Sequence, residues 1–386
     1  MNILLVNYEY PPVGAGAATA TREIGAALHR MGHKVAVLTS SFEDLTGTRV
    51  EDGVKVVRVP SKRRRPDSAS IIEMSSFMLH AAAAISAVIR DEAIDAVVCF
   101  FSIPGGPVAL LAKARTGTPF VVSLRGGDVP GAERSLGLLH ALLRPIRRAI
   151  LKSATAVVAN SDGLKDLSEA ADPVPVTVIP NGVDSSFFSP LPAAQRPESG
   201  RVRLLFVGRF QAQKNLVWML ERLAEVKLLP GSPFVIQLVG DGPQRGEIVA
   251  ATKALGIQGD VEIGQWTERP RLREHYQRAD ILLNPSLYEG MPNVVAEAMS
   301  CGCPVVASRV PGNESIVEDG RTGWLFGIGD DTGFVRLMRW AIDHPRERHT
   351  AGLASRDRIT TTYSWDRSAQ SYLELLLQSR PNPSLA

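Results

Sequence analysis

Two glutamates, Glu289 and Glu297, lie close together in the segment SLYEGMPNVVAEAMSCG. The pattern predicts a loop at Glu289 and a helix over 294–300 that carries Glu297 among apolar neighbours. Burying a carboxylate without a partner costs several kcal/mol, so Glu297 needs a hydrogen-bond donor. A vicinal diol such as a ribose offers two donors to one carboxylate. The alternative is a core arginine.

A second group of residues suited to chemistry is cationic. The segment GR-x4-KN places Arg209 at the end of a predicted strand and Lys214 at the start of the next helix. Two cations on such a turn can converge on a diphosphate, together with helix N-terminal amides. The amides near Asn293 and Val294 would face a phosphate in the same way. The alternative is a solvated loop with surface cations.

Two glycine-rich segments follow predicted strands. In Gly240–Pro243 (GDGP) glycine allows close backbone approach and proline suits a first helical turn, although an ordinary turn explains the segment as well. Pro11–Gly16 contains G-x-G but is no dinucleotide fingerprint. Tyr8–Pro12 separates it from the strand, and no acidic residue ends the second strand. A sugar or phosphate could still approach this loop.

Short apolar strands alternating with helical patterns must position these residues. Strands that are apolar on both faces indicate parallel sheets covered by helices on two sides. The predicted strands cover residues 3–7, 34–39, 96–101, 120–124, 156–159 and 176–179 in the first half, and 203–207, 234–239, 261–263, 281–284 and 305–307 in the second.

The length of 386 residues suits two domains. We expect an α/β protein with two Rossmann-like domains facing each other across a cleft, where such sheets bind ligands. An N-terminal domain covers 1–184, a linker rich in proline and serine covers 185–200, and a C-terminal domain covers 201–364. The helical pattern over 365–379 could tie the domains together, and 380–386 is predicted to be a disordered tail.

Composition argues against several functions. The formal net charge of +3 is small for the length and gives little support to nucleic-acid binding. Three cysteines cannot form a disulfide framework, the histidines show no metal-ligand spacing, and no D-x-D motif suggests a metal. The N-terminus shows no signal peptide, and no window approaches the roughly 20 apolar residues of a membrane span. A cytosolic protein is expected.

One segment raises the question of membrane contact. Residues 133–152 (ERSLGLLHALLRPIRRAILK) combine a broad apolar face with several cations, and a basic amphipathic helix can lie on an anionic membrane. The many leucines favour the alternative, a core-packed helix with solvated arginines. The basic run 62–66 would extend a basic surface, or it is an exposed loop. The cations of the helix are Arg144, Arg147, Arg148 and Lys152.

Together, the motifs resemble those of the retaining glycosyltransferases of family four. The resemblance rests on GR-x4-KN at 208–215, GDGP at 240–243 and PS-x2-EG-x2-N-x3-E at 285–297. It extends over nearly the whole chain through YPP-x-GAG, GHKVAVLT, SDGL, VIPNGVD, GCPVVAS and GRTGWLF. It implies the two-domain GT-B architecture, with a C-terminal helix that returns to the N-terminal domain.

The resemblance also implies roles for individual residues. Arg209 and Lys214 would hold the diphosphate of a nucleotide-sugar donor and stabilise it as it leaves. Glu289 would lie beside the donor sugar, Glu297 would bind the ribose, and Trp266 would lie by the base. Further donor contacts are implied for Gly16, Gly208, Gly240, Gly290, Met291, Pro292, Asn293 and Val294.

The implied reaction needs no metal and no cofactor besides its donor. The donor is UDP- or GDP-linked, and the acceptor is a glycan or lipid-linked molecule of envelope polysaccharide or glycolipid assembly. Breaking the anomeric C–O bond leaves a diphosphate anion, which Arg209, Lys214 and helix amides stabilise most in the transition state. From the N-terminus and the basic amphipathic pattern, rather than from the resemblance, we expect a cytoplasmic location with peripheral contact at the inner face of the membrane.

One departure from the family concerns Arg125. Many relatives carry His-Gly after the strand that here reads PFVVSL, whereas this chain continues with Arg125-Gly126-Gly127-Asp128. Arginine cannot act as a general base at neutral pH, but it can bind an anionic group. We therefore expect Arg125 and Asp128 on the acceptor side. Two other functions stay open, a nucleotide-sugar epimerase on the same scaffold and a non-catalytic nucleotide-sugar-binding protein.

Overall fold

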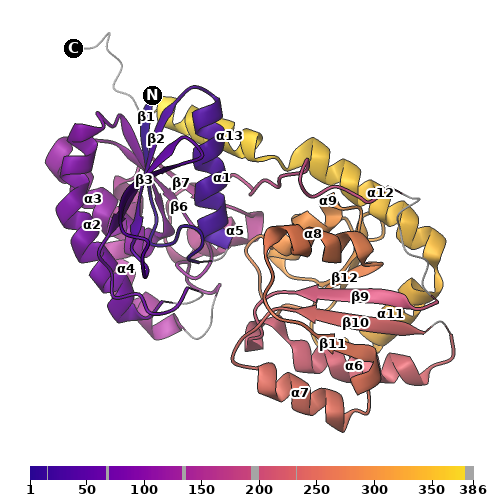
Figure 1. Ribbon diagram of the computed structural model, residues 1–386. Coiled ribbons are helices and arrows are strands. Elements are labelled where there is room, and N and C mark those ends of the chain that lie inside the picture. Colours follow the sequence, from indigo (N-terminus) through magenta and orange to yellow (C-terminus); the bar gives the residue numbers. More distant parts are fainter. Residues whose placement is uncertain (15, 67–68, 133–135, 193–199, 232, 379–386) are drawn as a thin grey trace. The chain divides into compact units, whose positions relative to one another are not determined.

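The computed structural model of the protein describes residues 1–378, apart from residues 15, 67–68, 133–135, 193–199 and 232. The chain divides into two compact units (Figure 1). Unit 1 comprises Met1–Gly182 and the C-terminal segment from Trp365, and unit 2 comprises Val183–Ser364.

Unit 1 contains an eight-stranded sheet with the order β3-β4-β2-β1-β5-β6-β7-β8. The edge strand β3 is antiparallel to β4, and the other neighbours pair in parallel. The strands are β1 (Asn2–Val6), β2 (Lys34–Ser40), β3 (Gly47–Glu51), β4 (Val54–Val59), β5 (Ala96–Phe100), β6 (Phe120–Ser123), β7 (Ala156–Ala159) and β8 (Val176–Val178). The helices are α1 (Gly16–Arg30), α2 (Ile71–Asp91), α3 (Gly106–Thr116), α4 (Gly137–Ser153), α5 (Asp162–Ala171) and α13 (Trp365–Gln378), and Phe101–Gly105 forms one π-helical turn.

Helices cover both faces of this sheet because its central strands are apolar on both sides. On β1, Leu4 and Val6 pack with α2, α3, α4 and α5 on one face. Ile3 and Leu5 point to the other face, where they pack with α1 and α13. This alternation explains why the strands read as continuous apolar runs.

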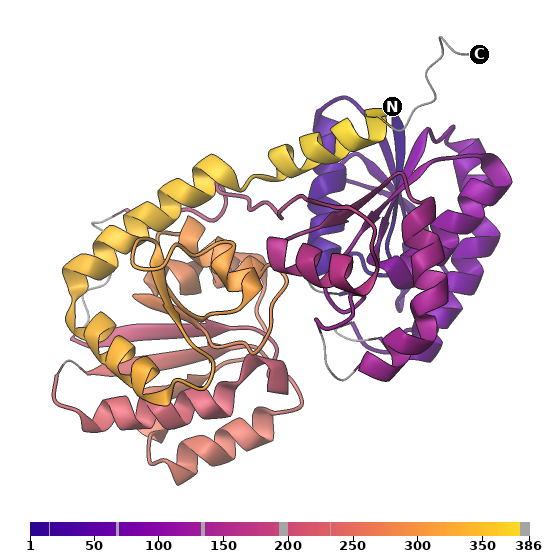
Figure 2. The same ribbon diagram turned by 180° about the vertical axis from the view of Figure 1, so that it is seen from behind.

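The C-terminal helix α13 belongs to unit 1, as predicted. The views from both sides show it beside α1 (Figures 1 and 2). The Tyr372 hydroxyl lies 2.6 Å from Ser123 Oγ of β6, and Ser368 Oγ donates to the Pro180 carbonyl at 2.7 Å. The chain therefore leaves unit 1 after its last strand and returns to it at its end.

Unit 2 contains a parallel six-stranded sheet with the order β11-β10-β9-β12-β13-β14. The strands are β9 (Val202–Val207), β10 (Phe234–Val239), β11 (Val261–Ile263), β12 (Ile281–Asn284), β13 (Val305–Ser308) and β14 (Gly323–Phe326). The helices are α6 (Leu216–Leu228), α7 (Arg245–Ala254), α8 (Arg269–Arg278), α9 (Asn293–Ser300), α10 (Pro311–Glu314), α11 (Asp331–Asp343) and α12 (Pro345–Thr362), with 3-10 turns at Ala212–Lys214 and Gln258–Asp260. Cores on both faces confirm the α/β prediction.

The first residues of the predicted linker 185–200 belong to unit 2 in the structure. Phe188 is 1% exposed and packs edge-on against Tyr276 of α8, so the chain is already part of unit 2 there. The segment was predicted to be a linker because serine and proline dominate its composition, although the buried Phe188 anchors it to unit 2. The linker residues 193–199 and the predicted tail 380–386 lie outside the described residues.

Helix α2 also departs from expectation. By length and composition it is apolar enough to cross a membrane, although no window of the sequence was expected to approach that length. Phe77, Ala81, Ile85 and Ile89 bury one of its faces in the core of unit 1. In this structure α2 is therefore a helix of the domain, and its other face leaves Ile71, Ile72 and Leu79 exposed.

Candidate active site

The residues singled out in the second half of the sequence gather at one edge of the unit 2 sheet. The central strands β10, β9 and β12 are neighbours and run in parallel. The loops after their carboxyl ends, 208–215, 240–244 and 285–292, must therefore meet at the same edge. In such sheets this edge is where ligands bind.

The first two of these loops touch through their backbones. The Phe210 amide donates to the Asp241 carbonyl at 2.8 Å, and the Gln244 amide donates to the Phe210 carbonyl at 3.0 Å. A Cβ atom at position 240 would lie 1.9 Å from the Gly208 carbonyl oxygen. Glycine at 240 is thus required by this close approach, which holds the Arg209 loop in place.

We expect Gly240→Ala to destabilise unit 2 by roughly 3 kcal/mol, because the methyl group must push the two loops apart. The measurement is urea unfolding followed by tryptophan fluorescence. Gly246→Ala in α7 is the matched control, since no atom lies within 4 Å of the added methyl group. Equal stability of both variants would show that the loops separate without cost.

Lys214 and Glu289 form the central ion pair of the site. The Lys214 ammonium binds Glu289 Oε1, and both side chains are largely buried. Ser286 Oγ donates to the same carboxylate oxygen at 2.7 Å. The sequence predicted both charged residues, and the structure brings them together.

Backbone contacts fix the two loops that carry this pair. Gln213 Nε2 donates to the Tyr288 carbonyl at 2.7 Å, and the Leu287 amide donates to the Gln213 carbonyl at 2.8 Å. On the other side, a Cβ at position 312 would lie 2.4 Å from the Gly290 carbonyl oxygen. The Glu289 loop is thus held from both sides.

A buried polar network lies beneath Glu289, and the sequence interpretation missed its role. Asn284 Nδ2 donates to Asn313 Oδ1 at 2.8 Å, and Asn313 Nδ2 donates to the Ser308 carbonyl at 2.8 Å. Ser308 Oγ donates to the Ser286 carbonyl at 2.5 Å. The sequence feature that could have revealed the network is that two apolar strands, ILLN and VVAS, each end in a polar residue. The network holds Ser286 in position for Glu289.

Glu297 lies in α9, where its carboxylate has an aromatic partner. The Tyr276 hydroxyl of α8 donates to Glu297 Oε2 at 2.9 Å. Burial raises the pKa of Tyr276 well above its usual value, and the neighbouring Glu297 charge adds to the effect. Tyr276 therefore stays protonated as a donor. The sequence interpretation weighed a core arginine and did not identify this tyrosine.

Helix α9 begins directly after the Glu289 loop, at the same edge. Its N-cap residue is Pro292, which makes no side-chain capping hydrogen bond. Met291 and Pro292 are buried, whereas Gly290, Asn293 and Val294 are half-buried. The positive end of the helix dipole therefore lies next to Lys214 and Glu289, an arrangement suited to a phosphate group.

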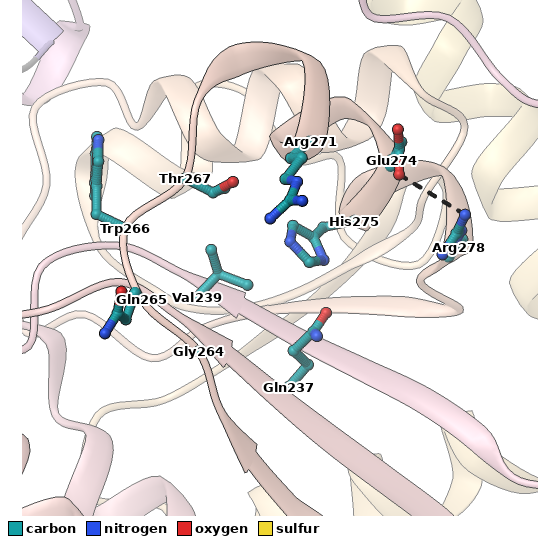
Figure 3. Close-up of a pocket in the computed structure, with 10 residues that line it drawn as sticks. All are labelled: Gln237, Val239, Gly264, Gln265, Trp266, Thr267, Arg271, Glu274, His275 and Arg278. Carbon is teal, nitrogen blue, oxygen red and sulfur yellow. Dashed lines mark ion pairs between the residues drawn. The ribbon is translucent and has the colours of Figure 1, made fainter.

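Trp266 lies at a separate pocket of about 470 Å³, lined by β10, the loop after β11 and α8 (Figure 3). Arg271 and His275 of α8 face this pocket, whereas the Tyr276 side chain is buried and contacts Glu297. The Trp266 ring is largely exposed. Arg245 Nη1 donates to the Gly264 carbonyl at 3.0 Å, which joins the loop that carries Trp266 to the segment after β10. The contact of Trp266 with a base stays a prediction.

Asp128 of unit 1 is buried in the loop after β6. Its buried carboxylate accepts hydrogen bonds from the backbone amides of Ser102 at 2.6 Å, Arg125 at 2.9 Å and Gly126 at 3.2 Å. These bonds shape the loop after β6. Asp128 therefore fixes the backbone of this loop, and a role on the acceptor side stays a prediction.

The Arg125 side chain is likewise engaged within unit 1. Its guanidinium donates to Asn181 Oδ1 at 2.7 Å and to the Tyr372 hydroxyl at 3.3 Å, and it stacks on the Phe100 ring. Arg125 thus links the loop after β6 to α13, and its contact with an acceptor stays a prediction. Gly16, also of unit 1, opens α1 and is exposed.

No group of three or more histidine, cysteine, aspartate or glutamate side chains is placed to hold a metal ion within the described ranges.

Two α/β units with mainly parallel sheets, the second with a sheet edge suited to a phosphate group, define a protein of the GT-B class. Residues 15–182 match the family described as "Glycosyl transferase 4-like domain", and residues 201–344 match "Glycosyl transferases group 1". A D-inositol 3-phosphate glycosyltransferase of Kineococcus radiotolerans is 30% identical, covering 92% of this chain and 88% of that protein. The chain therefore belongs to the glycosyltransferases of the GT4 type, the family that these matches describe.

Solved structures share the fold over the whole chain. Sucrose-phosphate synthase from Thermosynechococcus elongatus has a TM-score of 0.84 at 20% identity, covering 98% of both chains. The Anabaena protein HepE in complex with UDP and glucose has a TM-score of 0.76 at 19% identity, covering 98% of this chain and all of that one. These likenesses establish the GT-B architecture.

Proposed function

We propose that the protein is a retaining, metal-independent hexosyltransferase that uses a UDP-sugar. Its acceptor is a glycan or lipid-linked molecule of envelope polysaccharide or glycolipid assembly. The observation that carries the proposal is the Lys214–Glu289–Ser286 cluster beside the N-terminus of α9. A cation, a helix N-terminus and a hydrogen-bonded carboxylate at one sheet edge suit a sugar diphosphate.

In this proposal the phosphate-binding groups lower the barrier by stabilising the leaving group. Negative charge grows on the diphosphate as the anomeric C–O bond breaks. Lys214, Arg209 and the α9 amides stabilise it more strongly in the transition state than before, which is what accelerates the reaction. Glu289 orients Lys214 and lies beside the sugar. The leaving phosphate accepts the acceptor proton, so no protein nucleophile is required.

Glu297 binds the ribose in the same proposal, and Tyr276 holds its carboxylate. We expect Tyr276→Phe to raise the Kd of UDP about three- to tenfold, since the carboxylate loses the hydrogen bond that orients it. Isothermal titration calorimetry measures the change. Tyr363→Phe is the matched control, because the Tyr363 hydroxyl donates to the Ser315 backbone carbonyl at 2.7 Å. Equal affinities in both variants would contradict the role of Tyr276.

The choice of UDP over GDP rests on one similar structure, HepE, which was solved with UDP and glucose. A panel of UDP- and GDP-sugars, first by thermal shift and then by nucleotide release, tests it. The proposal predicts release that depends on an acceptor and persists with EDTA. Conversion of the free sugar without acceptor would indicate an epimerase. Donor stabilisation without turnover in any acceptor mixture would indicate a binding protein.

We further propose a cytoplasmic enzyme that contacts the inner face of the membrane, where a lipid-linked acceptor would be reached. Exposed apolar side chains and cations on unit 1 support this contact.

A further inference from the structure

Helix α4 carries an exposed apolar stripe, contrary to the expectation that its leucines are buried. Leu138, Leu142 and Ile146 are 91%, 75% and 50% exposed. Their spacing of four residues places them along one side of the helix. His140, Ile150 and Leu151 face the core instead. Exposing so much apolar surface in one row is costly in water and marks an interaction surface.

Cations border this stripe. Arg144, Arg148 and Lys152 follow one another at the same spacing of four residues, so they form a second row beside the apolar one. Arg144 and Lys152 are exposed, and Arg148 is half-buried. Arg147 lies apart, because it is buried in an ion pair with Asp172 at 2.6 Å. Arg148 also pairs with Asp172 at 3.4 Å, so the surface charge of α4 comes mainly from Arg144 and Lys152.

Helix α2 presents a similar combination. Ile71, Ile72 and Leu79 are 61%, 70% and 72% exposed. The basic run before it leaves Lys62, Arg64 and Arg65 exposed, and the Arg64 amide donates to Glu73 of the first turn of α2 at 2.9 Å. The basic run thus lies beside the exposed isoleucines. Arg63 is the exception, buried against Tyr8.

The two helices lie on the same side of unit 1. Both pack on one face of its sheet, with α3 between them (Figure 1). They follow the carboxyl ends of β4 and β6, which run in the same direction. Ile71 and Leu138, at the helix starts, therefore lie toward the same edge of unit 1. Six of the sixteen large apolar side chains exposed in the described chain belong to α2 and α4.

We propose that unit 1 docks on an anionic membrane through this α2–α4 surface, formed by Leu138, Leu142, Ile146, Ile71, Ile72 and Leu79 with the bordering cations. Apolar side chains enter the acyl boundary while the cations bind lipid phosphates, the arrangement of interfacial helices. A second copy of the chain fits less well, because a symmetric contact would bring the cation rows of two copies together. The inference gives the proposed membrane contact a defined surface, and it does not depend on the transfer reaction.

Flotation with vesicles tests the surface. The full chain is expected to float with vesicles of 30% phosphatidylglycerol in phosphatidylcholine, and much less with pure phosphatidylcholine or in high salt. Leu138→Gln/Leu142→Gln and Arg144→Gln/Lys152→Gln should each weaken binding about tenfold or more. Leu228→Gln/Leu353→Gln and Lys253→Gln/Arg346→Gln are matched controls, because these side chains are exposed in unit 2.

Thermal unfolding and UDP binding of the variants show whether each one is folded. Failure of the wild type to bind anionic vesicles would overturn the proposal, as would equal binding by the α4 variants and their controls. Light scattering tests the alternative that a second copy of the chain binds this surface. If the wild type is a dimer, the α4 leucine variant is a monomer and vesicle binding is unchanged, the surface joins two copies and the membrane proposal is overturned. Loss of vesicle binding with intact nucleotide release would leave the proposed reaction standing.

Discussion

Replacing Lys214 by alanine is expected to lower kcat for sugar transfer about 100- to 1,000-fold, with a smaller effect on donor KM. The reason is that the ammonium acts most strongly on charge that develops in the leaving diphosphate, and removing one such preorganised group has effects of this size. Steady-state nucleotide release with saturating acceptor measures the change. A variant with a raised donor KM and unchanged kcat would show that Lys214 only binds the donor.

The buried ion pair requires a control for stability. Lys214→Ala leaves the Glu289 carboxylate buried without its cation, which by itself destabilises the loop. The double variant Lys214→Ala/Glu289→Ala removes both charges, so its folding should be closer to the wild type than that of the single variant. If the double variant also regained transfer, the loss in Lys214→Ala would be due to a distorted loop and not to missing electrostatic stabilisation.

Replacing Glu297 by alanine is expected to raise the Kd of UDP about 30- to 100-fold. In the proposed function its carboxylate accepts two hydrogen bonds from one ribose, and bonds to charged groups are stronger than neutral ones. Isothermal titration with UDP measures the loss. The variant also leaves the buried Tyr276 hydroxyl without its acceptor, so its thermal stability is recorded in parallel.

A ligand without a ribose provides the matched comparison for Glu297. Inorganic pyrophosphate offers the two phosphates but no diol, so its affinity should change little in Glu297→Ala. An equal loss for UDP and pyrophosphate would mean that the α9 terminus is disturbed. Unchanged UDP affinity would remove Glu297 from the donor site.

The fold could be predicted where side chains are apolar on both faces of a strand. β9 and β10 are apolar except for Arg203 and Gln237, because both faces are covered. β3 and β4 were missed because β3 is an exposed edge strand of mixed composition, GTRVE, that pairs only with β4. β14 was missed because it is short and begins with Gly323, where a Cβ would lie 2.3 Å from the Val305 carbonyl.

The charged residues of the candidate site could be predicted, but the groups that hold them could not. Lys214 and Glu289 stand out because two charges follow strands at suitable spacing. Ser286, Ser308 and Asn313 do not, since short polar residues at strand ends are common in turns. Their role appears only when β12 and β13 lie side by side.

Surface and core leucines of α4 show a further limit of sequence reasoning. A leucine-rich helix predicts burial, but the sequence does not reveal how many sides of the helix find a partner. Here the side facing the sheet of unit 1 is buried, while Leu138 and Leu142 have no covering element in the described chain. Only the neighbouring elements decide between a core helix and an interfacial one.

The central claim is that the Lys214–Glu289 edge of unit 2 serves sugar transfer from a nucleotide donor. Acceptor-dependent release of UDP from a UDP-sugar, followed by phosphorus NMR alongside the anomeric proton of the product, tests it most directly. The account predicts UDP release that requires acceptor, an anomeric configuration that matches the donor, and loss of both signals in Lys214→Ala. UDP release of equal rate in Lys214→Ala, or an inverted product, would contradict it.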